Sequence, residues 1–537
     1  MRSLDRRQFL RGSLGFLAAA LPSGHQGCRG APPPEEMNLL LVVLEDCTAS
    51  SLACYGNPIA KTPHLDAFAA TAVRFARAYC QAPVCNPSRA SFLTGLRPDS
   101  TRILYNQNAL DRTLPKGVLT LPELAAPRGA FRIDVGKIFH RAESAQRQMQ
   151  AFDRIEFSSA PAGYRGVATG WTPPGAARRA RRFRYSSDPE LEARLIELFA
   201  QQERVSKELE VGSPEWLRAQ WPFQRLLSEV VGDSGLAEEA ELDGQKARLA
   251  AEALHELAAS KRQFLLALGF DRPHTPLRCP KEYLDLYDSA RMALPPAPPE
   301  QDRGVPAVAR RFGRNYDIFS SFEPTEARVR QALVAYYACV SFVDAQIGVV
   351  LRALDEAGLA GSTIVVVLAD HGFHLGEHGC WSKSTLFEQS TRVPLLVRVP
   401  GAPANGRECG AIVELVDLVP TVCDWWRVPA PRRLEGRSFA PLLQSPERPW
   451  KKAAFALCPI ENVLGRSVRT RRYRYAEWRG RRTTSGEFVS AVELYDLHED
   501  PWEQNNLAGD PGQREIAARH FGLLRRHLEA WPGRDLR

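Results

Sequence analysis

Four short apolar runs, separated by stretches with a helical pattern, constrain the fold of this chain most strongly. The runs are Asn38–Leu44, Phe131–Gly136, Phe264–Phe270 and Thr363–Ala369. They are rich in β-branched and other apolar residues and have the length of fully buried strands. A long amphipathic pattern, Val329–Gly358, precedes the fourth run. This alternation predicts an α/β fold in which helices cover both faces of a parallel sheet.

Ionisable residues follow each of the four predicted strands. They are Glu45-Asp46, then Lys137 and His140, then Asp271-Arg272 and His274, and finally Asp370-His371. Any one of these groups is also explained by a helix cap or a solvated turn. Because ligands bind beyond the carboxyl ends of the strands in open parallel sheets, the four groups together predict a binding site at one sheet edge.

Three carboxylates and one imidazole in this set indicate a metal site. Unpaired, the carboxylates of Glu45, Asp46 and Asp370 would repel one another, and one of them would stay protonated. A divalent cation would resolve the repulsion, and oxygen-rich ligands favour Ca²⁺ or Mg²⁺ over zinc. The alternative is three separately solvated acids.

The segment that begins at Cys85 has residues that commonly begin and end a helix. Asn86 is a candidate N-cap, Pro87 suits the first turn, and Gly95 is a candidate end. Cys85 would then lie at the positive end of the helix, where we expect a lowered thiol pKa and an affinity for anions. Arg89, in the first turn, would help to hold an anion. The alternative is a small buried cysteine at the start of a helix.

Several motifs together resemble a known family. Cys85-Asn86-Pro87-Ser88-Arg89, followed by Leu93-Thr94-Gly95, matches the signature of the type I sulfatases, in which the cysteine is oxidised to formylglycine (3-oxoalanine). The segments "DVGKIFH", "GFDRPHTPLRCPKEY" and "ADHGFHLGEHGCWSKSTLFEQSTRVPLLV" look most like the iduronate-2-sulfatase type. The resemblance spans about Asn38 to Leu507, apart from Ala160–Ala240.

The resemblance implies a fold and a metal. The fold is the alkaline phosphatase-like sulfatase fold, a large mixed, mostly parallel sheet sandwiched by helices with a smaller C-terminal antiparallel subdomain. The metal is Ca²⁺, with Mg²⁺ as the alternative, and its implied ligands are Glu45, Asp46, residue 85, Asp370 and His371. Sulfatases commonly place two aspartates after the first strand, so Glu45 is a departure that shifts the ligand geometry.

The resemblance also implies a reaction, the hydrolysis of a sulfate ester on a sugar such as a glycosaminoglycan or another sulfated polysaccharide. Its implied catalytic residues are Cys85, Arg89, Lys137, His140, His274 and Lys383. Arg89 and Lys137 would hold the hydrated formylglycine, and His140 would support proton removal during sulfate release. Lys383 and His274 would face the ester oxygens, with His274 protonating the departing sugar oxygen. A formylglycine-generating or sulfatase-maturing enzyme is the implied partner.

The same residues are also compatible with other activities. A phosphonate or phosphodiester hydrolase, or a sulfamidase, of the same superfamily would use the same residues. A non-enzymatic alternative is a protein that binds sulfated polysaccharides and keeps Cys85 unmodified.

The N-terminus is typical of an export signal. Residues 1–30 contain the pair Arg6-Arg7, a short apolar run and small residues, a pattern that predicts a twin-arginine signal peptide and a periplasmic or extracellular location. The alternative is a basic amphipathic helix. Cys28 offers a lipid-anchoring site, although its flanking residues match that signal poorly. We expect a catalytic domain over 31–445, with an insertion or lid at 160–240, and a C-terminal subdomain over 446–537.

Composition limits the remaining function classes. The formal net charge is +8, of which residues 1–30 contribute +4, so the rest of the chain carries +4 (8 − 4), a mildly basic value compatible with an anionic substrate. Two arginine-rich stretches, Arg178–Arg184 and Arg466–Arg474, lack a nucleic-acid-binding motif, so we expect solvated surfaces or polyanion contacts there and no nucleic acid partner. The eleven cysteines show no zinc-binding spacing, and Cys339 and Cys423 are expected to be buried thiols. The sequence contains no run of about 18 apolar residues, so we expect no transmembrane helix.

Overall fold

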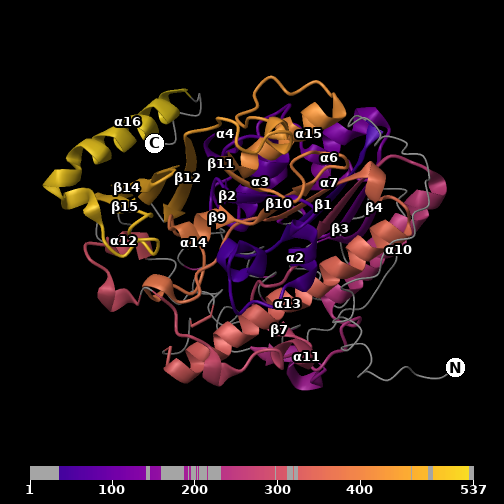
Figure 1. Ribbon diagram of the computed structural model, residues 1–537, viewed down its shortest axis with the longest axis horizontal. Coiled ribbons are helices and arrows are strands. Elements are labelled where there is room, and N and C mark those ends of the chain that lie inside the picture. The colour runs from indigo at the N-terminus through magenta and orange to yellow at the C-terminus, as the bar shows by residue number, and fades with distance from the viewer. Residues whose placement is uncertain are drawn as a thin grey trace. The chain divides into compact units, whose positions relative to one another are not determined.

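A large mixed sheet forms the centre of the described structure (Figure 1). The computed structural model describes residues 36–140, 145–158, 187–191, 193–194, 197, 201, 204, 215, 231–296, 298–310, 318–319, 324–460, 463–481 and 488–530. The strand order is β11-β2-β10-β8-β1-β6-β3-β4, with β9 beside β2. The strands are β1 (Asn38–Leu44), β2 (Val73–Tyr79), β3 (Phe131–Gly136), β4 (Arg154–Ser158), β6 (Phe264–Gly269), β8 (Thr363–Ala369), β9 (Arg392–Val393), β10 (Leu395–Arg398) and β11 (Glu408–Glu414).

Most of these strands run in one direction, as the sequence predicts. Only β9 and β10 are antiparallel to their neighbours among the described strands of this sheet. The four predicted strands are adjacent and parallel in the order β8-β1-β6-β3. The predicted bounds are confirmed, except that the third strand ends at Gly269 instead of Phe270.

The register of these four strands brings their carboxyl ends level. Leu44 pairs with Ala369, and Gly136 pairs with Gly269. The ladder continues one residue further, because the Asp370 amide donates to the Leu44 carbonyl at 3.1 Å and the Lys137 amide to the Gly269 carbonyl at 3.0 Å. The ionisable residues that follow the strands therefore start from one edge of the sheet.

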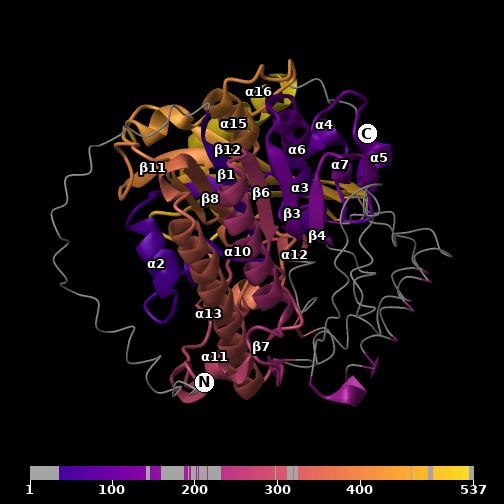
Figure 2. The same cartoon turned by 90° about the vertical axis from the view of Figure 1, so that its right-hand side faces the viewer.

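Helices cover both faces of the sheet (Figures 1 and 2). One face is covered by α2 (Pro63–Ala69), α10 (Leu242–Ser260) and α13 (Glu326–Glu356), and the other by α3 (Cys85–Thr94), α6 (Leu121–Ala125) and α15 (Leu418–Trp426). Shorter helices are α4 (Pro98–Thr101), α5 (Leu110–Thr113), α7 (Gln146–Met149), α11 (Lys281–Leu284), α12 (Ala307–Arg310) and α14 (Glu388–Thr391), with 3₁₀ turns that include η8 (Pro299–Gln301) and η10 (Glu377–Gly379).

The long helix α13 is apolar enough to resemble a membrane span. Within the part of the chain that the structure describes, it is the one helix that meets this criterion of length and composition, yet 89% of its most apolar window is buried inside the protein. Its apolar residues, such as Leu333, Phe342 and Leu354, belong to the hydrophobic core beneath the sheet. The apolarity of α13 is therefore explained by packing within the fold.

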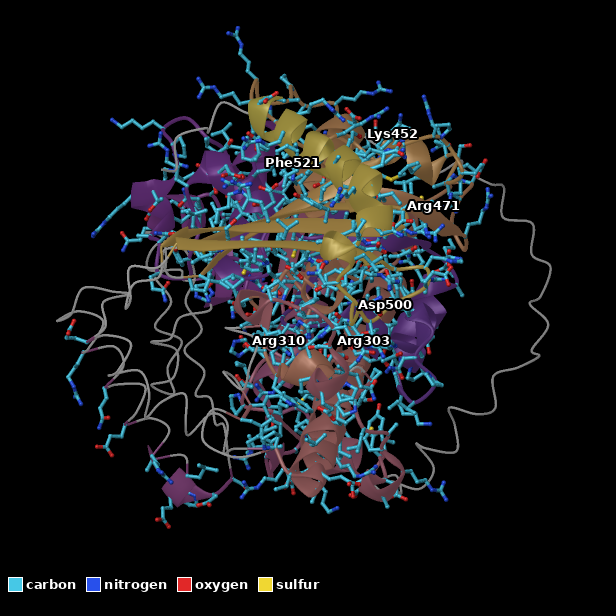
Figure 3. The ribbon with its side chains drawn as sticks, turned by 90° about the vertical axis from the view of Figure 1, so that its left-hand side faces the viewer. Arg303, Arg310, Lys452, Arg471, Asp500 and Phe521 are labelled. Atoms are coloured by element: carbon cyan, nitrogen blue, oxygen red, sulfur yellow. The ribbon has the colours of Figure 1, made fainter. Side chains whose placement is uncertain are left out.

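A smaller antiparallel sheet follows in the C-terminal part of the chain. Its strands pair in the order β12 (Ala453–Ile460), β13 (Val463–Thr470), β14 (Tyr473–Arg481) and β15 (Phe488–Asp496). Helix α16 (Arg514–Ala530) packs on it through a small core that includes Leu524, Tyr475 and Leu494. Figure 3 shows α16 in front of this sheet, with Phe521 on the helix. A two-stranded sheet joins β5 (Gly232–Asp233) to β7 (Arg278–Cys279).

The arginine-rich stretch Arg466–Arg474 forms the expected solvated surface only in part: Arg471 and Arg472 are exposed, whereas Arg469 and Arg474 are buried. Arg474 is 1% exposed and forms ion pairs with Glu493, at 3.1 Å, and with Glu503. Arg469 forms an ion pair with Glu388 at 2.8 Å. The alternation of side chains along β13 and β14 turns these arginines inward, where acidic residues neutralise them.

Several predictions concern residues outside the described part of the chain. They include the export signal at 1–30, Cys28, the stretch Arg178–Arg184 and most of the insertion at 160–240. The domain bounds therefore stay predictions. All ten described cysteines are free thiols, and Cys339 and Cys423 are buried as expected.

Candidate active site

The turn after β1 presents Glu45 and Asp46 in a constrained backbone. Asp46 has a φ of 53°, a left-handed backbone conformation that residues other than glycine seldom adopt. Two long-range hydrogen bonds hold it: the Asp46 amide donates to Asp370 Oδ1 at 3.2 Å, and the Tyr336 hydroxyl donates to the Asp46 carbonyl at 2.7 Å. Both carboxylates are buried.

Helix α3 places Cys85 at its first position. The predicted cap was wrong: Val84 is the N-cap, and Asn86 lies inside the first turn. The acceptor for the Asn86 amide is instead Asn106 Oδ1, at 2.9 Å, from a loop twenty residues further along the chain. Gly95, with a φ of 71°, ends the helix as predicted.

Arg89 connects the segments of the site. Its guanidinium donates from Nη2 to Glu45 Oε2 at 2.6 Å and from Nε to Asp370 Oδ2 at 3.0 Å. It also donates from Nη1 to the carbonyls of Lys137 and, at 3.1 Å, Ile138. With 1% of its surface exposed, this side chain joins the ends of β1, β3 and β8 to α3.

The other predicted cationic and imidazole groups lie around the same carboxylates. Lys137 Nζ contacts Glu45 Oε1 at 2.5 Å, and Lys383 Nζ contacts Asp46 Oδ2 at 2.7 Å. His274 Nε2 lies 3.8 Å from Asp46 Oδ2, and its side chain is 28% exposed. His140 is partly exposed, three residues beyond Lys137. The structure thus joins eight of the predicted residues in one connected network of contacts: Glu45, Asp46, Cys85, Arg89, Lys137, Asp370, His371 and Lys383.

Charge balance at the site differs from our expectation. The three carboxylates face three cationic side chains, so their repulsion is already offset without a metal. Burial alone would raise the pKa of Glu45, but the charges of Lys137 and Arg89 lower it well below its ordinary value. Repulsion among the three carboxylates therefore does not by itself require a metal.

The expected lowering of the thiol pKa was also wrong. Burial, together with the negative charge of Glu45, raises the pKa of Cys85 well above its ordinary value. The helix N-terminus does not outweigh these effects, because the thiol has 1% of its surface exposed and faces acidic neighbours. An unmodified Cys85 would thus be a poor nucleophile.

The donor atoms nevertheless fit a hard cation. Two groups have ligand atoms within 4.8 Å of one another: Glu45, Asp46, Cys85 and His274, and Cys85, Asp370 and His371. Asp46 Oδ1 is buried and has no hydrogen-bond partner among the described residues. His371 Nδ1 lies 3.0 Å from the Gly372 carbonyl, so a neutral ring that donates there leaves Nε2 free to bind a cation. Nε2 faces both Asp46 Oδ1 and Cys85 Sγ at 3.4 Å.

Sequence reasoning missed three residues at the site. Tyr336, from the middle of α13, donates to the Asp46 carbonyl and accepts from the Thr48 amide at 3.2 Å. Ser88 Oγ donates to the Asp370 carbonyl, and Asn106 caps α3. Ser88 lies in the signature motif and could have been found there, whereas Tyr336 reads as one more core aromatic residue.

Two buried histidines, His374 and His378, support the loop between β8 and α14. His374 Nε2 lies 2.7 Å from Thr385 Oγ1, and His378 Nδ1 lies 2.8 Å from Asp302 Oδ1. Both rings are fully buried, and His378 stacks on Phe387. They fix the loop that carries Lys383.

Comparisons with known proteins identify the family of the chain. The sequence model of the sulfatase family matches residues 37–428, and a model described as N-sulphoglucosamine sulphohydrolase, C-terminal, matches residues 376–529. Iduronate 2-sulfatase from Mus musculus is 30% identical over 95% of this chain and 96% of its own length.

Solved structures support the same fold. A phosphonate monoester hydrolase from Silicibacter pomeroyi has a TM-score of 0.68 at 22% identity and covers 92% of this chain and 95% of its own. A structure in complex with its substrate D-glucosamine-2-N,6-O-disulfate has a TM-score of 0.68 at 19% identity and covers 94% of this chain and 100% of its own. The chain therefore belongs to the sulfatase family and is a sulfuric ester hydrolase, with iduronate 2-sulfatase among its most similar relatives.

Proposed function

We propose that the chain removes sulfate from a sulfated sugar by a formylglycine mechanism, with residue 85 as the nucleophile. The observation that carries the proposal is the position of residue 85. Its Sγ lies 3.4 Å from His371 Nε2, and the buried carboxylates and cationic groups of the site surround it. An unmodified thiol with a raised pKa is a poor nucleophile, whereas an aldehyde hydrate supplies two hydroxyl groups at the same position.

The reaction would proceed in two steps, a displacement at sulfur followed by elimination of sulfate. One hydroxyl of hydrated residue 85 loses its proton to water and attacks sulfur, forming an oxygen–sulfur bond while the bond between sulfur and the sugar oxygen breaks. His274 protonates the departing sugar oxygen. The second hydroxyl then loses its proton, with His140 as the acceptor, and the carbon–oxygen bond to sulfate breaks as the aldehyde reforms. Water rehydrates the aldehyde for the next cycle.

Cationic side chains would stabilise the charge that develops on sulfate. Lys383 lies against Asp46 and is 7% exposed, while Arg89 and Lys137 lie on the Glu45 side of the site. Since Arg89 is locked by four acceptors, it is oriented before substrate binds and requires no rearrangement in the transition state.

A hard divalent cation, Ca²⁺ or Mg²⁺, would be held by Glu45, Asp46, residue 85, Asp370 and His371. When bound, it would neutralise sulfate oxygens and favour ionisation of the attacking hydroxyl. Glu45 already accepts from both Arg89 and Lys137, so the chain uses its longer side chain to bridge two cations. That bridging explains how glutamate is accommodated where sulfatases commonly have aspartate.

Substrate class is proposed from the relatives. The mouse relative is an iduronate 2-sulfatase, and a structural neighbour is a 2-O glycosaminoglycan sulfatase. The test is to measure initial rates on one preparation with a 2-O-sulfated uronic acid oligosaccharide, N-sulfated glucosamine and a phosphonate monoester. Preference for the sulfated uronic acid is expected. A higher kcat/KM for the phosphonate ester or for the N-sulfate would overturn the proposed substrate class.

Export by the twin-arginine route is proposed from Arg6-Arg7 and the apolar run behind them. Replacing both arginines with lysine should retain the protein in the cytoplasm, as fractionation and immunoblotting would show. Unchanged export of this double variant would refute the proposed route.

A further inference from the structure

The loop that follows α4 lies against the N-terminus of α3 and carries Asn106 to residue 85. Asn106 is half-buried. Its Oδ1 accepts from the Asn86 amide at 2.9 Å, and its Nδ2 contacts Cys85 Sγ at 4.0 Å. No motif in the sequence marks this residue.

The orientation of the Asn106 amide follows from its partners. A backbone N–H can only donate, so the atom that faces the Asn86 amide must be the oxygen of Asn106. The other end of the side-chain amide, its NH₂ group, is therefore directed at residue 85. Sulfur is a weak acceptor, and 4.0 Å is the outer limit for a hydrogen bond to it. Oxygen is a stronger acceptor, and the hydrate carries two hydroxyl oxygens on the same carbon, one of which can turn toward Nδ2.

Further hydrogen bonds hold the loop in place. Asn86 Nδ2 donates to the carbonyls of Tyr105, at 3.2 Å, and Asn108, at 2.8 Å. Asn108 Oδ1 in turn accepts from the amides of Leu104 and Tyr105, at 2.9 and 2.8 Å. The Asn106 donor is thus fixed by its surroundings before substrate arrives.

We infer that Asn106 is a catalytic residue that donates a hydrogen bond from Nδ2 to one hydroxyl oxygen of hydrated residue 85. This inference rests on the proposed formylglycine mechanism. By holding one of the two hydroxyls, Asn106 fixes the rotation of the hydrate, so that the other hydroxyl is presented to sulfur. Nδ2 then stays hydrogen-bonded to the same oxygen, which loses its proton when sulfate is released.

Two substitutions separate this role from the capping role. Asn106→Asp keeps an acceptor for the Asn86 amide, and a carboxylate is favourable at a helix N-terminus, but it removes the donor. Asn106→Ala removes both. The matched control is Asn108→Asp, which adds the same charge to the same loop and keeps the acceptor for the Leu104 and Tyr105 amides.

The measurements are kcat and KM for sulfate release, the thermal midpoint, and the converted fraction of residue 85 by peptide mass spectrometry, to which kcat is normalised. Loss of one such hydrogen bond predicts a kcat about tenfold lower in both Asn106 variants. Asn106→Asp should retain the wild-type thermal midpoint, Asn106→Ala should lower it, and Asn108→Asp should keep kcat within about twofold of wild type.

A normalised kcat for Asn106→Asp equal to that of wild type would overturn the inference. So would an equal loss in Asn108→Asp, because that would trace the effect to charge in the loop. Other results would contradict the proposed function and not the role of Asn106 alone. They are full activity in wild-type protein whose Cys85 is an unmodified thiol, and no sulfate release from converted wild-type protein.

Discussion

Removing Arg89 should destabilise the protein far more than removing a surface arginine, because it leaves two buried carboxylates short of a partner. Arg89 pairs with Glu45 at 2.6 Å and with Asp370 at 3.0 Å, and none of these side chains is more than 1% exposed. In Arg89→Met, Glu45 keeps Lys137, and Asp370 keeps the amides of Asp46 and His371.

These remaining contacts limit the loss to that of one broken buried network, about 3–5 kcal/mol. The entropy of unfolding is about 2.1 cal/mol/K per residue, so a chain of this size changes by about 1 kcal/mol per degree. The thermal midpoint of Arg89→Met should therefore fall by about 3–5 °C.

A double-mutant cycle identifies the cause. If the loss comes from an unpaired carboxylate, Glu45→Gln combined with Arg89→Met should be more stable than the sum of the single changes predicts, by about 1–3 kcal/mol. Thermal unfolding followed by circular dichroism, at matched scan rates, supplies the four midpoints. A fall of less than about 1 °C for Arg89→Met, or strict additivity in the double variant, would refute the reasoning.

Three further predictions follow from the site and from α16. His274→Asn should reduce kcat strongly for a sugar sulfate but weakly for a nitrophenyl sulfate, whose leaving group needs no proton; equal losses would exclude the general-acid role. Exhaustive chelation should abolish sulfate release, with recovery on adding Ca²⁺ or Mg²⁺, and an unaffected rate would argue against a required cation. Burial, with the charge of Arg97, lowers the pKa of His527 to about 3, below its ordinary value of 6.5. The folded state thus resists protonation, and wild type should lose about 1.4 kcal/mol per pH unit as pH falls below about 6.5, a loss that His527→Gln removes; parallel pH–stability curves would contradict this.

The sheet and its active edge were predictable from local sequence. The runs at Asn38–Leu44 and Thr363–Ala369 are confirmed as strands, since apolar runs of this length have few alternatives to a buried parallel strand. Parallel pairing then places the following residues at one edge, which is why Asp46 and Asp370 are in contact although 324 positions separate them.

The errors arose where distant residues decide the local chemistry. Asparagine is a common N-cap residue, which is why Asn86 was predicted as the cap. The acceptor for its backbone amide is instead the side chain of Asn106, whose position no local sequence pattern indicates. The helix N-terminus suggested a reactive thiol at Cys85, yet burial and Glu45 have the larger effect on its pKa. Tyr336 supports the Asp46 turn from the middle of a helix whose apolar pattern otherwise indicates only packing.

The formylglycine mechanism is tested most directly by the chemical state of residue 85 in active protein. The protein should be produced in a host able to mature sulfatases, and the peptide that contains residue 85 analysed by mass spectrometry beside sulfate-release rates from the same batch. We predict an aldehyde in place of the thiol, with activity proportional to the converted fraction, and no activity in Cys85→Ala. Full activity in protein whose Cys85 is an intact thiol would contradict it.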